Sequence, residues 1–431
     1  MKILWVCAGL MPEAAEASGY DSKVYGGGWT SALLAHLIKL SSENQFFILS
    51  LDYRKCDVSI GNVRHVSFGE KGKFNYSRQR RKIEEFIHDK IKEFRPDIIH
   101  IHGTEYYYGC LSSYVYENVP TVVSIQGIIS EYYIHYDGGL NPEDTWWTNI
   151  SLRLIKDRYT ISHERNRWKF LRSGQEQKTM SMHSNFIGRT EWDRANVYYY
   201  NNAAKYYHGD ETLRSVFYDS KRDESKIIKH SVYCGAAAGY PLKGVHYLLK
   251  AIACLKNEYS DIQLRIAASD GELGQNRTLM QRIKGYPYGA YLRKLIRDLD
   301  LSDNVVALPR LSAPEVVAEL ERAELFVLPS LCENSPNSLG EAMLVGTPAI
   351  ATCAGGTSSI LKDGVEGRLV PTYSAAALAY AIKEAFDNPL KARQMAKKAR
   401  ETALRRHDGK TNAMALLNIY SDIIEDCRKR K

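Results

Sequence analysis

Two glutamates and one lysine have the chemistry and the spacing to bind a phosphorylated sugar or ribose. Glu333 and Glu341 stand eight positions apart, just after the apolar run 325–329. Side chains on a helix lean toward its N-terminus, so the Glu341 carboxylate can reach a hydroxyl beside a bound phosphate. Lys243, followed by Gly244 at the start of another helical stretch, can neutralise phosphate charge. Each of the three also has a purely structural interpretation, as a solvated charge or as a complement to a helix dipole.

The two glutamates flank the expected start of one helix. Ser335 is a favourable N-cap and Pro336 suits the first helical position, so the helix should begin there and end near Gly346. The N–H groups of its first turn have no carbonyl partner one turn earlier and favour an anion such as phosphate. These N–H groups belong to Asn337, Ser338 and Leu339.

Glycines stand where two other strands meet their helices. Gly355 and Gly356 follow the apolar run 348–352, and Gly27 and Gly28 end the long connection after the first strand. Glycine lets the backbone come close to a ligand, although a tight turn or a surface loop uses it equally well. The connection at Gly27 and Gly28 lacks the G-x-G-x-x-G spacing of dinucleotide binding, which argues against an NAD enzyme.

The first half of the chain has a second group of polar side chains at strand ends. His102 and Gln126 end two strand-like runs, and Tyr106 and Tyr132 follow them. Tyrosine rings beyond a strand end can stack on a sugar while their hydroxyls bind it. His100 and His102 share a strand face, but no carboxylate or cysteine set accompanies them. We therefore interpret His102 as a hydrogen-bonding group and expect no metal.

The elements that must position these residues alternate along nearly the whole chain. Strand-like apolar runs occur at 3–8, 45–51, 97–102, 121–126, 232–237, 263–268, 304–308, 325–329 and 348–352. Helical stretches lie between them, which predicts an α/β fold with doubly wound parallel sheets. The segment 196–229 has poor strand signals and separates two groups of strands. We predict two facing Rossmann-like domains, with ligands bound in the cleft beyond the carboxyl ends of the strands.

The predicted domains span residues 1–210 and 225–408, and a C-terminal helix at about 411–431 is expected to pack back on the first. The chain has 431 residues, of which 44% are hydrophobic and 25% charged, a composition that excludes a disordered or collagen-like protein. No apolar run approaches the roughly 20 residues that span a bilayer. Eight dispersed cysteines without a CxxC pair argue against a disulfide framework, and we expect a cytoplasmic protein.

A basic, tryptophan-flanked stretch has two interpretations. Residues 151–172 carry seven lysines and arginines, and Trp146, Trp147 and Trp168 flank or join them. Such a helix can lie peripherally on an anionic membrane, here the inner face of the cytoplasmic membrane, and receive a lipid-linked acceptor. The alternative is a solvated helix that packs its tryptophans inward. We expect no nucleic-acid partner, because the sequence shows no coherent basic stripe in a recognised module.

Together these motifs resemble glycosyltransferase family 4. The resemblance rests on Glu333-x7-Glu341 after a Val-Leu-Pro-Ser strand, on the following Glu-Ala-Met-x-x-Gly-Thr-Pro, on Gly355-Gly356 and on Lys243-Gly244. It covers nearly the whole chain and is far more specific in the C-terminal half. It implies the GT-B fold and a retaining, metal-independent hexosyltransferase without a cofactor. Such an enzyme moves a sugar from a nucleotide-sugar donor to a glycan or polyprenyl-linked acceptor, in the synthesis of cell-surface polysaccharide or glycan.

The resemblance also implies roles for single residues. The glutamate that matches Glu333 contacts the donor sugar near the reacting centre, and the one that matches Glu341 holds the ribose. The lysine that matches Lys243 neutralises the departing diphosphate. The first domain would bind the acceptor, with Gln126 and Arg189 near it, and the second the donor.

One position departs from the family pattern. An arginine usually stands six residues before the lysine, where this chain has Ala237. Half of the cationic clamp on the leaving group is therefore missing, unless Arg189 or Arg310 replaces it. Two alternatives stay open: a nucleotide-sugar-binding protein with weak or lost transferase activity, and a nucleotide-sugar 2-epimerase of the same fold.

Overall fold

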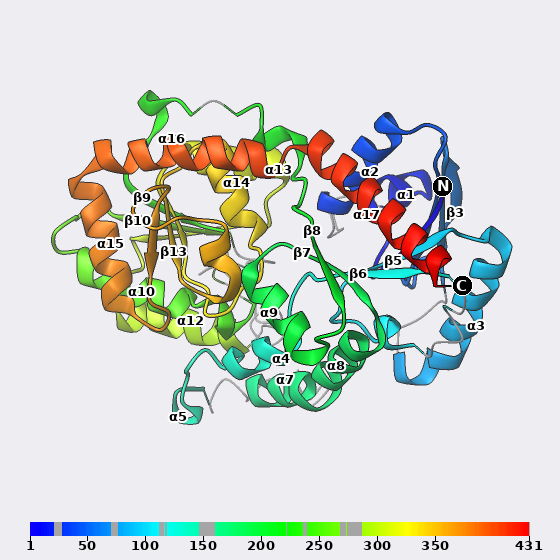
Figure 1. Cartoon of the computed structure of the whole chain (residues 1–431). Coiled ribbons are helices and arrows are strands. Elements are labelled where there is room, and N and C mark those ends of the chain that lie inside the picture. Colours follow the sequence, from blue (N-terminus) through cyan, green and yellow to red (C-terminus); the bar gives the residue numbers. More distant parts are fainter. Residues whose placement is uncertain are drawn as a thin grey trace. The chain divides into compact units, whose positions relative to one another are not determined.

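The computed structural model describes residues 1–20, 28–69, 76–111, 116, 119–145, 160–220, 222–235, 239–267, 273 and 287–430. Gly27, Ala237, Trp146 and Trp147 lie outside these ranges. The chain divides into two compact units (Figure 1). Unit 1 contains residues 1–130, 171–214 and 406–431, and unit 2 contains residues 131–170 and 215–405.

Unit 1 is built on an eight-stranded sheet in the order β3-β4-β2-β1-β5-β6-β7-β8. Its strands are β1 (Lys2–Cys7), β2 (Gln45–Ser50), β3 (Asp57–Ile60), β4 (Val63–Ser67), β5 (Ile98–His102), β6 (Thr121–Ser124), β7 (Asn185–Gly188) and β8 (Lys205–His208). All neighbours pair in parallel except β3 and β4, which form an antiparallel hairpin at one edge. The parallel sheet predicted for the first half is confirmed.

The prediction of poor strand structure in 196–229 is wrong at β8. This edge strand is Lys-Tyr-Tyr-His and is at most half-buried, so it has neither a continuous apolar run nor an alternating apolar face. Aromatic residues nevertheless favour the extended backbone, and pairing with β7 holds the strand at the edge of the sheet.

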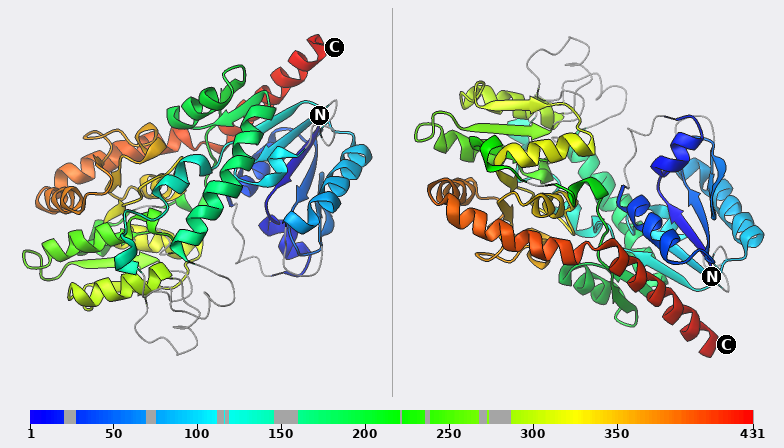
Figure 2. Two further views of the ribbon diagram at one scale, coloured as in Figure 1. Left: turned by 90° about the horizontal axis from the view of Figure 1, so that it is seen from below. Right: turned by 90° about the horizontal axis from the view of Figure 1, so that it is seen from above.

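Helices cover both faces of this sheet. They are α1 (Pro12–Ala17), α2 (Gly28–Leu40), α3 (Tyr76–Phe94), α8 (Ser173–Met182), α9 (Glu191–Tyr200) and α17 (Gly409–Lys429), with a 3₁₀ turn at Tyr107–Cys110; the short helix α4 (Ile129–Tyr132) begins in unit 1 and ends in unit 2. Along β1, Leu4 and Val6 pack toward α3, whereas Ile3 and Trp5 pack toward α2 and α17. Figure 2 shows α2 and α3 on opposite sides of the blue strands.

The C-terminal helix α17 is held in unit 1 by a buried tyrosine. The Trp5 indole N–H donates to the Tyr420 hydroxyl at 2.9 Å, and His100 Nδ1 lies 2.6 Å from the same oxygen. The helix begins at Asp408, whose carboxylate accepts the Thr411 N–H. Burial lowers the pKa of His100 well below its ordinary value, so its ring is neutral and serves as a hydrogen-bonding group.

Unit 2 is built on a six-stranded sheet in the order β11-β10-β9-β12-β13-β14. Its strands are β9 (Ile228–Cys234), β10 (Gln263–Ala267), β11 (Val305–Leu308), β12 (Ala323–Leu328), β13 (Ala349–Thr352) and β14 (Arg368–Val370). Every pair is parallel, so all carboxyl ends lie along one edge. The helices are α5 (Pro142–Thr145), α7 (Ile161–Arg167), α10 (Val245–Leu255), α12 (Pro287–Asp298), α13 (Ala313–Arg322), α14 (Asn337–Val345), α15 (Ala375–Asp387) and α16 (Pro389–Arg406).

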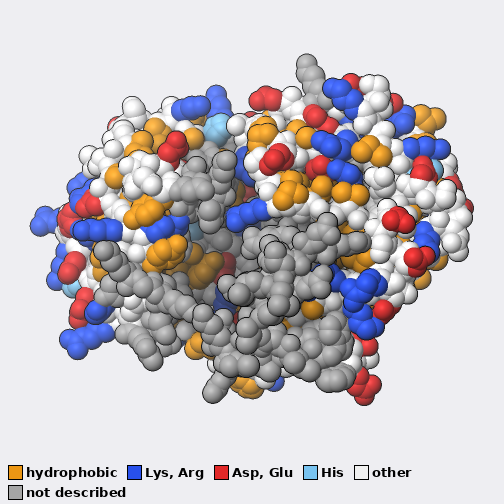
Figure 3. Space-filling model, turned by 180° about the vertical axis from the view of Figure 1, so that it is seen from behind, with side chains coloured by type: hydrophobic (Ala, Val, Ile, Leu, Met, Phe, Trp, Pro, Cys, Tyr) orange, Lys and Arg blue, Asp and Glu red, His pale blue; other side chains and the backbone are white. Residues whose placement is uncertain are grey.

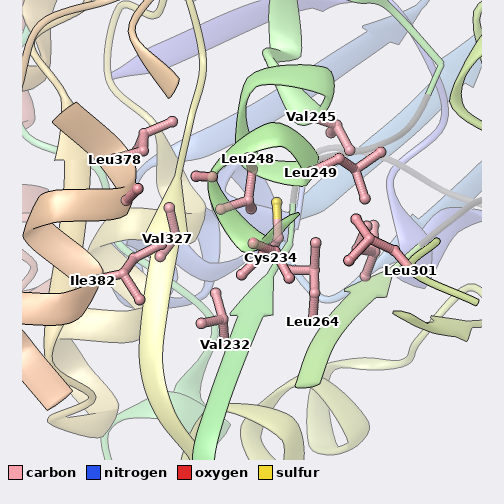
Figure 4. Close-up of a cluster of buried hydrophobic side chains, with 14 of the residues drawn as sticks. Val232, Cys234, Val245, Leu248, Leu249, Leu264, Leu301, Val327, Leu378 and Ile382 are labelled. Carbon is pink, nitrogen blue, oxygen red and sulfur yellow. The ribbon is translucent and has the colours of Figure 1, made fainter. Parts of the chain in front are cut away.

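Short helical turns complete unit 2. They are 3₁₀ turns at Tyr133–His135, Ser215–Phe217, Glu224–Lys226, Pro241–Lys243 and Gly355–Ser359, and a π-helical turn at Trp168–Arg172 that continues into unit 1. The main core lies where α10, α12 and α15 cover one face of the sheet. Figure 4 shows Val232 and Cys234 of β9 pointing toward Leu248 and Leu249 of α10, with Val327 and Leu264 beside them.

The segment 131–170, which belongs to the first half of the sequence, packs within unit 2. Its Trp168 ring lies 4.8 Å from that of Tyr136 and 6.1 Å from that of Tyr240. Trp168 therefore packs inward, as in the second of our two interpretations of this stretch. Among the described helices, none is long and apolar enough to cross a membrane. On the face shown in Figure 3, basic and acidic side chains are interspersed.

We predict that Tyr420→Phe lowers the free energy of unfolding of unit 1 by about 1–3 kcal/mol. The variant leaves the Trp5 N–H and His100 Nδ1 buried without their shared partner. Urea denaturation of this variant should be compared with that of Tyr199→Phe, because the Tyr199 side chain is 80% exposed in the same unit. Equal stability of the two variants would show that the Tyr420 hydroxyl does not hold α17 on the sheet.

Candidate functional site

Lys243 and Glu333 meet at the carboxyl edge of the sheet in unit 2. Lys243 ends the 3₁₀ turn after β9, and Glu333 lies in the loop after β12. Lys243 Nζ is 2.5 Å from Glu333 Oε1, and the Ser330 hydroxyl donates to the same oxygen at 2.8 Å. The Lys243 side chain keeps 28% of its surface exposed, whereas that of Glu333 keeps 11%. The cation is therefore within reach of a ligand.

Close packing between two loops produces this pairing. Gly244 has φ of +68°, and a Cβ at this position would lie 1.9 Å from the Pro329 carbonyl oxygen. Only glycine fits here. The Leu331 N–H donates to the Leu242 carbonyl at 2.8 Å, which joins the same two loops. Glu333 is fixed further by its carbonyl, which accepts the Gly356 N–H at 2.9 Å.

The helix between the two glutamates begins one residue later than the sequence predicts. Pro336 has φ of −71° and ψ of +106° and is the N-cap, so α14 starts at Asn337. Ser335 is therefore not the cap, which corrects our prediction. The predicted C-terminal stop is confirmed, because Gly346 is the C-cap with φ of +86°.

Two of the three N–H groups that we predicted to bind an anion are available in the structure. The Leu339 N–H already donates to the Pro336 carbonyl at 3.0 Å, so it is not available as predicted. Asn337 and Ser338 are the first two helical residues, whose N–H groups have no preceding turn to bond. The Asn337 side-chain oxygen is buried and has no hydrogen-bond partner among the described residues. These two N–H groups and the helix dipole favour an anion.

The remaining predicted donor-side residues lie in the same unit, with one exception. Glu341 is in the second turn of α14 and is 9% exposed. Gly355 and Gly356 begin a 3₁₀ turn and not the α-helix that we expected, and the Gly356 N–H already serves the Glu333 carbonyl. Gly28 is the exception, because it starts α2 in unit 1, where a Cβ would lie 3.0 Å from the Arg214 side chain.

Cys332, beside Glu333, is no nucleophile. Burial raises the pKa of its thiol far above the ordinary value, and the Glu333 and Glu131 carboxylates raise it further. Thiolate, the reactive form, is therefore absent at neutral pH. In the described part of the chain, no group of three or more histidine, cysteine, aspartate or glutamate side chains is arranged to hold a metal ion.

In unit 1, His102 lines a small pocket. The pocket has about 30 Å³ of room for water-sized molecules, far below the roughly 300–1,000 Å³ of sites for small-molecule ligands. His102 is 2% exposed, and neither ring nitrogen has a partner among the described residues. Burial lowers its pKa to about 3, so the ring stays neutral and offers one donor and one acceptor, as a hydroxyl group requires.

Arg189 lies in the same pocket but is committed to its own unit. It is 4% exposed, lies 3.3 Å from Glu211 and donates to the Ile125 carbonyl at 2.5 Å. Its guanidinium group is used within unit 1, so few of its N–H groups are left to bind a ligand. Gln126 is half-buried just beyond β6.

The tyrosines after β5 do not present one common surface. Tyr106 is half-buried and stacks on Tyr108 with ring centroids 5.3 Å apart. Tyr107 and Tyr108 are 5% and 0% exposed and belong to the hydrophobic core. Only Tyr106 of this run is placed where a ligand can touch it.

Sequence reasoning missed a carboxylate pair in unit 1. Glu176 is fully buried and accepts the N–H groups of Ile129 and Ser130 at 2.9 and 2.7 Å. Burial, with the nearby Glu176 charge, raises the pKa of Glu105 to about 7. One Glu105 carboxyl oxygen is buried without a hydrogen-bond partner among the described residues. No local motif signals this pair, because the two residues are far apart in sequence.

Comparison with known proteins finds a family model that matches most of unit 2. Residues 219–402 match the family model of the glycosyl transferases group 1. A D-inositol 3-phosphate glycosyltransferase of Pseudarthrobacter chlorophenolicus is 36% identical over 34% of this chain and 32% of its own length. An MMP alpha-(1->4)-mannosyltransferase of Mycolicibacterium hassiacum is 30% identical over 46% of this chain and 44% of its own length. The chain thus spans less than half the length of these relatives.

Solved structures match the whole chain at low identity. Sucrose-phosphate synthase of Thermosynechococcus elongatus has a TM-score of 0.69 at 16% identity and covers 99% of this chain and 100% of its own. Anabaena HepE in complex with UDP has a TM-score of 0.63 at 17% identity and covers 98% and 100%. With two parallel-sheet α/β units, these likenesses show that the fold is GT-B, as the sequence predicts.

We predict that Glu105→Gln stabilises unit 1 at pH 8 but not at pH 5. The native pKa of Glu105 is raised, so between about pH 4.5 and 7 the folded state binds more protons than the unfolded state. Stability is therefore lost as the pH rises through this window, by up to about 3 kcal/mol. Urea denaturation at both pH values measures the difference. Glu16→Gln, at an exposed carboxylate of the same unit, is the control and should show no such change.

Proposed function

We propose that the protein transfers a sugar from a nucleotide-sugar to an acceptor hydroxyl. The proposal is based on the match of residues 219–402 to the glycosyl transferases group 1. We propose a retaining, metal-independent reaction. The observation that carries the proposal is the pair of Lys243 and Glu333, 2.5 Å apart and adjacent to the N-terminus of α14. A diphosphate needs a cation and backbone N–H donors, and a sugar needs a carboxylate for its hydroxyls.

We assign each part of the donor to the protein groups that complement its charge or its hydroxyls. Its diphosphate lies against the Asn337 and Ser338 N–H groups and Lys243. Its ribose lies by Glu341, which is one turn into the same helix. Glu333 contacts Lys243, so it lies beside the diphosphate that Lys243 binds. The sugar is attached to that diphosphate, and Glu333 therefore faces the sugar. UDP in the HepE structure supports the inclusion of UDP-sugars among the donors to be tested.

In the reaction, the bond between the anomeric carbon and the diphosphate oxygen breaks, and a bond to the acceptor oxygen forms on the same face of the sugar. The acceptor proton passes to an oxygen of the leaving phosphate. The step needs no protein nucleophile, which fits the protonated state of Cys332. Lys243 and the N-terminus of α14 stabilise the negative charge that develops on the diphosphate.

The acceptor is a glycan or polyprenyl-linked hydroxyl, and we propose that unit 1 binds it. A hydroxyl both donates and accepts a hydrogen bond, so an amide or a phenol side chain can bind it. Gln126 and Tyr106, half-buried at the carboxyl ends of the neighbouring strands β6 and β5, are the residues proposed to touch it, whereas the neutral His102 is 2% exposed and lies behind the surface.

We predict that Glu333→Gln lowers the rate of sugar transfer about 100-fold, because the loss of one preorganised charge at a reacting centre typically has this effect. A panel of UDP-, GDP- and ADP-sugars, scored by thermal shift and by release of nucleoside diphosphate, identifies the donor and supplies the assay. Glu401→Gln, at an exposed position of α16, is the matched control.

Wild-type rates in Glu333→Gln would contradict the site assignment. Binding of a nucleotide-sugar without transfer or hydrolysis would support the alternative of a binding protein. Isomerisation of the donor sugar in the absence of an acceptor would identify the epimerase.

A further inference from the structure

A segment from the first half of the sequence contacts the loops that carry Lys243 and Glu333. We call residues 131–145 the strap; it includes the 3₁₀ turn Tyr133–His135 and the helix α5. The strap belongs to unit 2, as do all the residues that it is described as contacting below. Its contacts fall on the segments that follow β9, β12 and β14.

The first contact is with the loop of Glu333. The Asn334 N–H donates to the Tyr132 hydroxyl at 3.1 Å, although the two residues are 202 positions apart. Asn334 is fully buried, so its N–H needs an acceptor from the protein. The Tyr132 hydroxyl thus fixes the peptide bond that follows Glu333.

The second contact is with the turn of Lys243. Gly138 has φ of +66°, and a Cβ there would lie 2.8 Å from the Pro241 carbonyl oxygen. The Gly138 carbonyl accepts from His246 Nε2 at 3.1 Å and from the Tyr247 hydroxyl at 3.3 Å. Burial lowers the pKa of His246 to about 4, so the ring is neutral, with its proton on Nε2 facing this carbonyl.

The third contact is with the segment after β14. His135 Nδ1 and the Tyr373 hydroxyl are 2.6 Å apart. Tyr373 has φ of +60°, which is an unfavourable conformation for a residue with a side chain and persists only where surrounding contacts hold it. Burial raises the pKa of Tyr373 to about 12, so it is a neutral hydroxyl at this contact.

We propose that the strap is a positioning element of the donor site, and that Tyr132 is a positioning residue that holds the Glu333 loop against the Lys243 turn. This inference rests on the proposed function, because it assigns the strap a role in donor binding. Loops that are already ordered before the ligand arrives lose less conformational entropy on binding. The strap thereby raises affinity for the nucleoside diphosphate without being placed against it.

The test compares Tyr132→Phe with Tyr380→Phe, whose tyrosine is 69% exposed in the same unit. Tyr132→Phe should speed amide hydrogen exchange in peptides covering 331–335 about fivefold and leave exchange in 349–352 unchanged. Its affinity for the nucleoside diphosphate, measured by calorimetry with UDP, GDP and ADP, should fall about three- to tenfold. A merely structural loss would speed exchange equally in both peptides.

A second pair of variants tests the other end of the strap. Gly138→Ala adds a Cβ against Pro241, whereas Gly364→Ala adds one into open space at φ of +68°, so the two share the same backbone strain. Gly138→Ala should speed exchange in 241–244 and weaken nucleotide binding, and Gly364→Ala should do neither.

The proposal is overturned if Tyr132→Phe matches Tyr380→Phe, and Gly138→Ala matches Gly364→Ala, in both exchange and affinity. Failure of the wild-type protein to bind any of the three nucleoside diphosphates would instead contradict the proposed function. The exchange comparison needs no ligand and still decides whether Tyr132 holds the Glu333 loop.

Discussion

The turn at Pro241–Gly244 packs so closely on the chain after β12 that position 244 has no room for a side chain. This steric constraint places Lys243 2.5 Å from Glu333, 90 residues away in sequence. Because all strands of the sheet are parallel, both loops and the N-terminus of α14 lie along its carboxyl edge, where ligands of such sheets bind. The cation, the carboxylate and the helix N-terminus are therefore neighbours as a consequence of backbone packing.

Lys243 and Glu333 neutralise each other at this edge. A partly buried carboxylate is costly without a counter-ion, and Lys243 together with the Ser330 hydroxyl satisfies Glu333. In the proposed donor complex a diphosphate would compete for the same cation, and Lys243 would change its partner without new ordering of its backbone. In unit 1 the buried groups around the small pocket include the neutral ring of His102 and the ion pair of Arg189 with Glu211.

The sequence was sufficient to predict the central strands, because buried parallel strands such as β1, β2 and β12 each contain a continuous apolar run. It did not reveal the edge strand β8, whose burial is only partial. It misplaced the start of α14, because proline fits both the N-cap and the first helical position. The contact of Tyr132 with Asn334 and the effect of the Glu176 charge on Glu105 depend on long-range packing, which leaves no local period or motif.

The central claim is that Lys243 and the N-terminus of α14 form a site for a nucleoside diphosphate. Titration calorimetry of the wild-type protein with a nucleoside, its monophosphate and its diphosphate on one base tests it most directly. We expect the affinity to rise at least about tenfold with the second phosphate, since that phosphate gains a charge-assisted contact. Equal affinity for the three compounds, or binding of the nucleoside alone, would contradict the claim.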